Sequence, residues 1–196
     1  MKVGLYFGSF NPIHIGHLII ANHIANNTEL DEVWFIVSPK NPLKESASLL
    51  NEHHRYSLVK IAIEDEKKLK ANNVEFLMPK PSYTIDTLIY LSEKFKKHSF
   101  TLIIGNDSYL NFSKWKNHKQ IVLNYNMLIY PRPSFPIKTD LPGNIKVIDA
   151  PLLEISSTQI RRNIKEKKSI RYLVTEKVMD EIELKGYYRS ELENPS

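Results

Sequence analysis

Short apolar runs alternate with segments of helical periodicity along most of the chain, and this alternation constrains the fold most. The runs are apolar at nearly every position, as strands buried on both faces of a parallel sheet are. The segments between them repeat apolar residues every three to four positions, which predicts helices. The expected strands are residues 2–8, 32–38, 74–78, 100–105, 127–130 and 145–148, and the expected helices are residues 15–26, 53–70, 84–97, 157–165 and 175–185. The pattern predicts an α/β fold, with a central parallel sheet and helices on both faces.

The length of 196 residues fits one domain, since domains average about 150 residues. The chain shows no internal repeat, low-complexity segment or change of composition that would mark a boundary. We therefore expect a single domain over residues 1–190, followed by a disordered tail at 191–196.

The composition excludes several kinds of site. The chain has no cysteine, which excludes a disulfide framework, a thiolate zinc site, an iron–sulfur cluster and a cysteine nucleophile. Residues 3–28 lack charged side chains, but their many Asn, His and Gly residues are too polar for a membrane span. The apolar run after Lys2 is too short for a signal peptide. We expect a cytoplasmic protein with no membrane partner.

The formal net charge of +5 raises the question of nucleic-acid binding. Most basic residues lie in mixed clusters such as residues 64–68, which is typical of a solvated helix face. The chain has no zinc finger, basic arm or aromatic RNA-binding motif. The expectation is no nucleic-acid partner, and a modest positive excess also attracts small polyphosphates.

Two glycines mark the expected site. Gly8 and Gly105 end predicted strands, and ligands of open α/β sheets bind at such ends where the strand order reverses. Both can border one site if the first and fourth strands are neighbours. The backbone amides of Gly8, Ser9 and the following helix N-terminus would form an anion site.

The first predicted helix opens with two histidines and a glycine. His14 and His17 are three residues apart and should project to the same side of the helix. Gly16 costs ~1 kcal/mol relative to alanine in a helix, so its missing side chain must serve a purpose. Either a base or phosphate packs there, or helix and strand pack closely. A histidine metal pair is disfavoured because no third ligand is nearby.

Six short motifs follow one another along the chain. They are Gly8-Ser9-Phe10-Asn11-Pro12-Ile13-His14-Ile15-Gly16-His17, Pro81-Ser82-Tyr83-Thr84 with Asp86-Thr87-Leu88, Ile104-Gly105-Asn106-Asp107, Lys114-Trp115, Arg132-Pro133, and Ile155-Ser156-Ser157-Thr158-Gln159-Ile160-Arg161. Over nearly the whole chain they resemble the HxGH nucleotidyltransferases, and among these the bacterial nicotinate mononucleotide adenylyltransferases. Around Arg132 the chain departs from the family pattern, with Pro131 for Arg and Ser134 for Gly. The resemblance implies a Rossmann-like nucleotidyltransferase fold.

The resemblance also implies a reaction. The phosphate of nicotinate mononucleotide attacks the α-phosphorus of ATP, giving deamido-NAD and pyrophosphate. Such a transfer needs positioning and charge neutralisation rather than a nucleophilic side chain. Mg²⁺ would arrive with ATP, with no metal site made by the protein. The implied catalytic residues are His14, His17 and Arg161, and the implied ATP-binding residues are Gly8, Ser9, Phe10, Gly16, Gly105, Asp107, Ser156, Ser157 and Thr158.

Asp107 would accept hydrogen bonds from the ribose hydroxyls of ATP, or serve only as a helix cap. The hydroxyls from Ser156 to Thr158 are equally typical of a helix N-cap, and the two roles can coexist.

The acceptor pocket follows from the same resemblance. Trp115 would stack on the pyridine ring, and Thr84 with the backbone amide near Lys116 would hold the nicotinate carboxylate. Arg132 would bind the mononucleotide phosphate. Lys44 would add a phosphate contact from the basic loop at residues 39–48, where relatives have a histidine and this chain has Leu43.

Alternatives remain at this stage. Residues 14–17 spell HIGH, a signature of class I aminoacyl-tRNA synthetases, but 196 residues leave no room for a tRNA-binding body. An enzyme of the same fold could instead use nicotinamide mononucleotide, phosphopantetheine or a cytidylyl acceptor. A basic nucleic-acid-binding protein without activity is the alternative from another class. A homo-oligomer also stays open as an alternative to a monomer.

Overall fold

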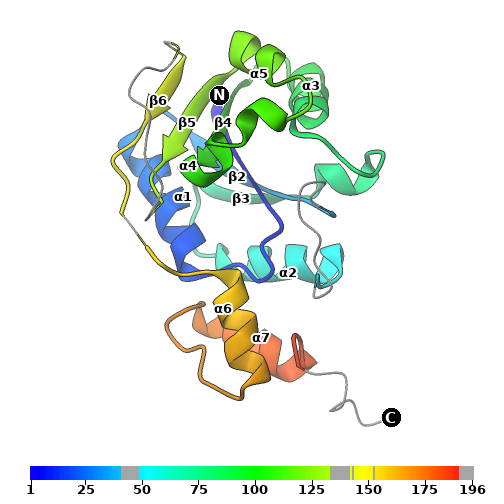
Figure 1. Ribbon diagram of the computed structural model, residues 1–196, viewed down its shortest axis with the longest axis vertical. Coiled ribbons are helices and arrows are strands. Elements are labelled where there is room, and N and C mark those ends of the chain that lie inside the picture. Colours follow the sequence, from blue (N-terminus) through cyan, green and yellow to red (C-terminus); the bar gives the residue numbers. More distant parts are fainter. Residues whose placement is uncertain (41–48, 133–141, 143, 152, 190–196) are drawn as a thin grey trace.

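The computed structural model describes residues 1–40, 49–132, 142, 144–151 and 153–189. Its strands form one sheet in the order β3-β2-β1-β4-β5-β6, and all neighbouring pairs are parallel (Figure 1). The strands are β1 Lys2–Gly8, β2 Glu32–Val37, β3 Leu69–Asn72, β4 Ser99–Gly105, β5 Asn126–Tyr130 and β6 Ile145–Val147. The order reverses between β1 and β4, which is where doubly wound sheets bind ligands. The predicted parallel α/β sheet, with its first and fourth strands adjacent, is confirmed.

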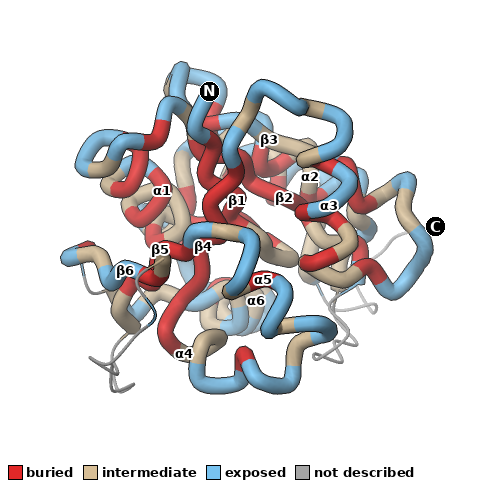
Figure 2. The backbone as a smooth tube through the Cα atoms, turned by 90° about the horizontal axis from the view of Figure 1, so that it is seen from above, coloured by how far each residue is buried: buried red, intermediate tan, exposed pale blue. Residues whose placement is uncertain are grey.

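Helices pack on both faces of this sheet. They are α1 Ile15–Asn27, α2 Glu52–Ala62, α3 Thr84–Lys94, α4 Asn106–Tyr109, α5 His118–Asn124, α6 Ser157–Lys165 and α7 Glu176–Lys185, with 3₁₀ turns η1 Val74–Leu77 and η2 Phe112–Lys114. One buried cluster joins the sheet to α1, α2, α6 and α7, and a second joins it to α3 and α5. Figure 2 shows the central strands buried between helices whose outer sides are exposed.

Strand residues alternate between the two clusters. In β2, Phe35 belongs to the cluster with α1, whereas Trp34 and Ile36 belong to the cluster with α3. Because successive side chains of a strand point to opposite faces, a sheet covered on both sides needs apolar residues throughout. This accounts for the continuous apolar runs of the sequence.

The third strand was predicted in the wrong place. Within residues 74–78, Val74–Leu77 form the turn η1 instead of a strand, and β3 begins with Leu69 and Lys70, which were assigned to the end of the helix at 53–70. That helix, α2, ends at Ala62. β3 pairs with β2 alone and contains Lys70 and Asn72, so it lacks the apolar run of a central strand. The short elements α4, η2 and α5 were not predicted.

Within the part of the chain that the structure describes, none of the helices has the length and apolar character needed to cross a membrane. Residues 191–196 and Lys44 lie outside the described residues.

Candidate active site

A pocket of about 150 Å³ opens where β1 and β4 end. Gly8 and Gly105 both line it. A Cβ atom on Gly8 would lie 2.8 Å from the ring of Phe10, and one on Gly105 would lie 3.1 Å from the ring of Tyr130 and clash with the Asp107 carboxylate. Side chains are therefore excluded at both strand ends, where the backbone borders the pocket.

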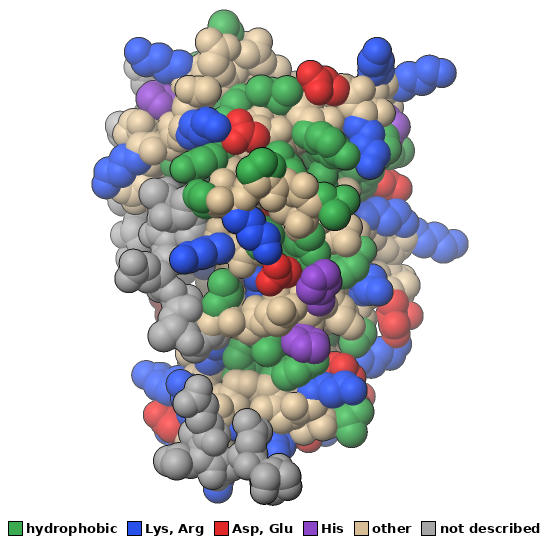
Figure 3. All heavy atoms as spheres, turned by 90° about the vertical axis from the view of Figure 1, so that its right-hand side faces the viewer, with side chains coloured by type: hydrophobic (Ala, Val, Ile, Leu, Met, Phe, Trp, Pro, Cys, Tyr) green, Lys and Arg blue, Asp and Glu red, His purple; other side chains and the backbone are tan. Residues whose placement is uncertain are grey.

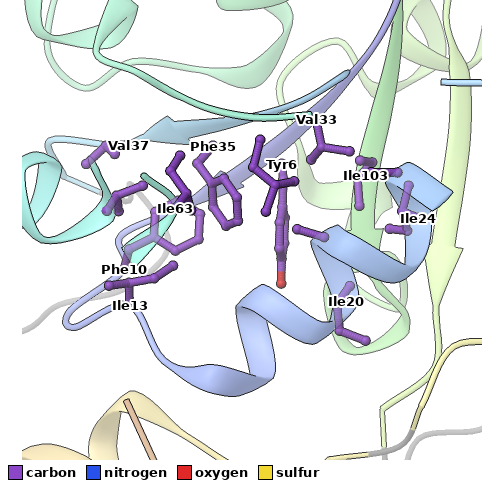
Figure 4. Packing of buried hydrophobic residues seen from close by; sticks show 14 of the residues in the cluster. Tyr6, Phe10, Ile13, Ile20, Ile24, Val33, Phe35, Val37, Ile63 and Ile103 are labelled. Carbon is purple, nitrogen blue, oxygen red and sulfur yellow. The ribbon is translucent and has the colours of Figure 1, made fainter. Parts of the chain in front are cut away.

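The loop from Ser9 to His14 is anchored in the core by its apolar residues. Phe10 has a φ of 45° and is 2% exposed. Its ring centroid lies 5.3 Å from that of Phe35 and 5.1 Å from that of His17. Figure 4 shows Phe10 and Ile13 directed into the cluster beside Phe35. The ring of Phe10 thus packs in the core, and a contact of this residue with ATP would use its backbone.

The two histidines stack on each other. Their ring centroids lie 3.6 Å apart with an interplanar angle of 24°, as expected from their spacing at the start of α1. The backbone N–H of His14 donates to Nδ1 of His17 over 3.3 Å. Because Nδ1 accepts, the neutral ring of His17 carries its proton on Nε2, which can donate to a ligand.

His14 is buried, with 4% exposure. Burial, together with the nearby charge of Arg132, lowers the pKa of His14 to about 3. The ring is therefore neutral at pH 7. Its Nδ1 has no hydrogen-bond partner among the described residues, so it can bond to an incoming group.

Gly16 leaves room for His14. A Cβ atom here would lie 3.1 Å from Nδ1 and Cε1 of His14 and 3.6 Å from the Cβ of Ile155. Contacts near 3.1 Å are closer than a side chain tolerates without a shift of its neighbours. The neighbours of this glycine are thus the imidazole of His14 and Ile155, neither of which lies on a strand, so the close contact differs from the expected packing of helix on strand.

Arg132 lies on the histidine side of the site. It lines a small depression together with His14 and His17. Its Nη2 donates to the hydroxyl of Tyr130 over 3.3 Å, and its Nε lies 3.8 Å from Oδ1 of Asp107. Burial acts to lower the pKa of Arg132, but Tyr130 and Asp107 outweigh it and raise the pKa. The guanidinium is thus a permanent positive charge beside both histidines.

The start of α6 is bonded to the loop that carries His14. Ser157 Oγ donates to the carbonyl oxygen of Pro12 over 2.9 Å, and Arg161 Nη1 donates to that of Asn11 over 2.7 Å. Arg161 Nη2 also lies 3.4 Å from Oγ1 of Thr158. The first and last motifs of the sequence, about 145 residues apart, meet here.

Ser156 is the N-cap of α6. Its side chain accepts a hydrogen bond from the backbone of Gln159 over 3.2 Å, so the predicted capping role is confirmed.

The other wall of the pocket carries the residues predicted for the acceptor. Thr84, Trp115 and Lys116 all line it. Thr84 begins α3, and the ring of Trp115 lies 5.3 Å from that of Phe112. The ammonium of Lys116 lies 2.8 Å from a carboxylate oxygen of Asp86 and 4.7 Å from the centroid of the Tyr83 ring. The structure brings these three residues together without assigning their roles.

Arg55 was missed by the sequence analysis. It is fully buried on α2 and donates to the carbonyl oxygens of Ser9, Ser38, Pro39 and Leu50. Burial lowers its pKa. Its signal in the sequence is its place on the apolar face of α2, three and four residues before the buried Leu58 and Val59.

Glu75 was missed as well. It lines the pocket as a buried carboxylate, with 2% exposure. Its signal in the sequence is a single acidic residue inside the apolar run at 74–78, which was assigned to a strand.

Known proteins resemble this chain over most of its length. The model of the family described as cytidylyltransferase-like matches residues 5–163. A probable nicotinate-nucleotide adenylyltransferase of Cytophaga hutchinsonii is 52% identical over 189 residues, which cover 96% of this chain and 98% of that protein. The chain belongs to the nicotinate-nucleotide adenylyltransferase family. Another member, the probable nicotinate-nucleotide adenylyltransferase of Flavobacterium psychrophilum, is 48% identical over 96% of this chain and all of its own length.

Solved structures share the fold of this adenylyltransferase family member. The nicotinic acid mononucleotide adenylyltransferase of Plasmodium falciparum, complexed with NaAD, matches with a TM-score of 0.80 at 22% identity. The match covers 95% of this chain and 97% of the other. The predicted Rossmann-like nucleotidyltransferase fold is thereby confirmed.

Proposed function

We propose that this adenylyltransferase moves the adenylyl group of ATP to nicotinate mononucleotide. An oxygen of the acceptor phosphate forms a bond to the α-phosphorus, the bond to the β-phosphate bridge breaks, and deamido-NAD and pyrophosphate leave. The observation that carries the proposal is a pair of adjoining pockets that share Tyr6 and Tyr130, one lined by His14, His17 and Arg132 and the other by Thr84 and Trp115.

The histidine side is proposed to hold ATP. His17 would donate from Nε2, and the backbone amides of Gly8, Ser9, Phe10 and Gly16 would contribute the uncharged part of the anion site. Arg161, with Ser157 and Thr158, would neutralise the β- and γ-phosphates from the start of α6. Asp107 would accept the ribose hydroxyls beside Gly105. The α6 hydrogen bonds to Pro12 and Asn11 fix these two groups of donors relative to each other.

Arg132 is proposed to bind the acceptor phosphate. It lies beside His14 and His17 while Tyr130, its hydrogen-bond partner, lines the larger pocket. A phosphate held at this junction would be next to the α-phosphorus that it attacks. Positioning of the two phosphates and stabilisation of their charge are then the protein's main contributions to the rate.

The nicotinate ring is proposed to occupy the pocket near Trp115. The indole would stack on the ring, and the Thr84 hydroxyl with the amide near Lys116 would bond to the carboxylate. The lysine side chain is engaged by Asp86, so its backbone is the group that the proposal uses. Lys44 is kept as a predicted phosphate contact outside the described residues.

Mg²⁺ enters this proposal as part of the substrate Mg-ATP. Imidazole, guanidinium and hydroxyl groups fit phosphate oxygens, and the carboxylate of Asp107 lies 3.8 Å from Nε of Arg132. These groups suit a metal that stays on the phosphates and water. Because ATP is the donor, the proposal includes the cytoplasmic location predicted from the sequence.

Nucleic acid has no part in the proposed activity. On the face in Figure 3, Lys and Arg side chains lie scattered among acidic and uncharged ones rather than in a basic stripe.

A pyrophosphate-release assay tests the proposal. The protein is incubated with Mg-ATP and, separately, nicotinate mononucleotide, nicotinamide mononucleotide and phosphopantetheine. Release is expected to be fastest with nicotinate mononucleotide. Faster release with phosphopantetheine, or release with none of the acceptors together with salt-dependent RNA binding, would overturn the proposal.

A further inference from the structure

Glu75 is a buried carboxylate whose partners are hydroxyl groups. Oε2 accepts from Ser82 Oγ over 2.8 Å, and Oε1 accepts from Thr87 Oγ1 over 2.9 Å. The Ser38 side chain also bonds to this carboxylate. Burial of a carboxylate is costly unless hydrogen bonds compensate for its lost hydration.

The three partners come from both sides of the pocket wall. Ser38 follows β2, and its backbone N–H donates to the carbonyl oxygen of Gly8 over 2.9 Å. Ser82 and Thr87 flank Thr84, before and after the start of α3. Through Glu75, the segment that carries Thr84 is therefore joined to the strand end that carries Gly8.

The residues that Glu75 connects also line the pocket. Gly8, Ser38, Glu75, Ser82 and Thr84 are all among its lining residues. A carboxylate can accept from three hydroxyls at once because it has two oxygens with about four acceptor sites. An amide of the same size would turn one acceptor into a donor, so the hydroxyl facing it would have to accept and its own proton would lose its partner.

We infer that Glu75 is a positioning residue for acceptor binding, which holds Thr84 against the ends of β1 and β2 through Ser82, Thr87 and Ser38. This inference rests on the proposed function. The effect of Glu75 is expected mainly on the acceptor, because two of its partners, Ser82 and Thr87, flank Thr84, whereas the proposed ATP residues of α6 are bonded to Pro12 and Asn11.

Glu75→Gln tests the inference. The KM for nicotinate mononucleotide is expected to rise about tenfold, while kcat and the KM for Mg-ATP stay within about twofold. A rise in one KM at constant kcat is the result of lost ground-state binding of that substrate. A general loss of structure would alter both substrates and kcat together.

A pair of variants at Thr87 checks the same connection without changing the carboxylate. Thr87→Ser keeps the hydroxyl and should keep the acceptor KM, whereas Thr87→Val removes it and should raise that KM. This pair decides the question if Glu75→Gln fails to fold. Equal acceptor KM values for the pair would overturn the inference.

Asn144→Ala is a matched structural control. Asn144 donates to the carbonyl oxygen of Tyr125 over 2.8 Å, beside the start of β5 at the opposite end of the sheet. This variant should lower the unfolding temperature without changing either KM.

The wild-type assay distinguishes failure of the proposed function from failure of the positioning role of Glu75. Absence of wild-type turnover with nicotinate mononucleotide contradicts the proposed function. With wild-type turnover present, unchanged or equally changed KM values in Glu75→Gln overturn the positioning role.

Discussion

The backbone N–H of His14 donates to Nδ1 of His17, and the two rings stack with their centroids 3.6 Å apart. One histidine therefore fixes the tautomer of the other. Nε2 of His17 carries the proton, while burial keeps the ring of His14 neutral. The pair can therefore supply the proposed ATP site with a directed donor without placing two positive charges side by side.

His17→Ala should lower kcat by about 10²–10³, because removal of one preorganised donor to developing charge has an effect of this size. It should also lower the free energy of unfolding by about 1 kcal/mol, since the bond from the His14 N–H at the helix start is lost. Steady-state assays and urea unfolding measure the two effects.

His17→Asn is the control, because its side-chain oxygen can still accept the His14 N–H. The free energy of unfolding should return towards the wild-type value, while kcat stays low. A His17→Ala variant with near-normal kcat would exclude His17 from the mechanism.

The pKa of His14 predicts how stability depends on pH. Its folded pKa of about 3 lies below the ordinary value of 6.5, so below pH 6.5 the unfolded chain binds a proton that the folded protein does not. This group therefore removes stability as pH falls from about 6.5 towards 3, by up to about 1.4 kcal/mol per pH unit, and has no effect above that window.

Urea unfolding at pH 7.5, 6 and 5 can isolate this effect by comparison with His14→Gln, which has no titrating ring. The wild type should lose more stability than the variant over this range. Parallel losses would show that His14 titrates normally in the folded protein.

Arg161→Lys keeps the positive charge but loses the planar fork that reaches Asn11 and Thr158. The KM for Mg-ATP should rise about tenfold with little change in the KM for the acceptor. Arg162→Lys is the matched control, because Arg162 is the next residue on α6 and is exposed. A raised KM for the acceptor with an unchanged KM for Mg-ATP would contradict the prediction and assign Arg161 to the acceptor half of the site.

The sequence predicted the central sheet well because its strands are apolar on both faces. Gly8 and Gly105 marked the two strand ends at the site, since side chains there would clash with Phe10 and Asp107. The sequence did not predict β3. An edge strand with one neighbour needs fewer apolar residues, so its pattern resembled the end of a helix.

The parts of the site that escaped the sequence analysis depend on tertiary contacts. Arg55 bonds to carbonyl oxygens contributed by three separated segments, and a carbonyl oxygen has no signal in the sequence. Glu75 gains two of its hydroxyl partners only when α3 and the residues before it pack against the turn η1. The motif of Arg132 was enough to assign this residue to the acceptor. Its closeness to His14 could be found only from the folded structure.

The preference for nicotinate over nicotinamide mononucleotide tests the acceptor pocket directly. The proposed pocket offers the carboxylate two donors, the Thr84 hydroxyl and the amide near Lys116. Nicotinamide replaces one oxygen by NH₂, which turns hydrogens towards one donor and leaves it unpaired. An unpaired buried polar group costs about 1–3 kcal/mol. At 1.36 kcal/mol per factor of ten, this gives roughly one to two orders of magnitude in kcat/KM.

Thr84→Val should reduce this preference, and Thr84→Ser should preserve it, because serine retains the hydroxyl at the start of α3. The measurement is kcat/KM for both acceptors at saturating Mg-ATP with the wild type and the two variants. Equal kcat/KM values for both acceptors in the wild type would contradict the carboxylate pocket and the choice of substrate together. A wild-type preference that survives in Thr84→Val would leave the substrate in place and assign the discrimination to the amide near Lys116, because that donor is untouched by the substitution.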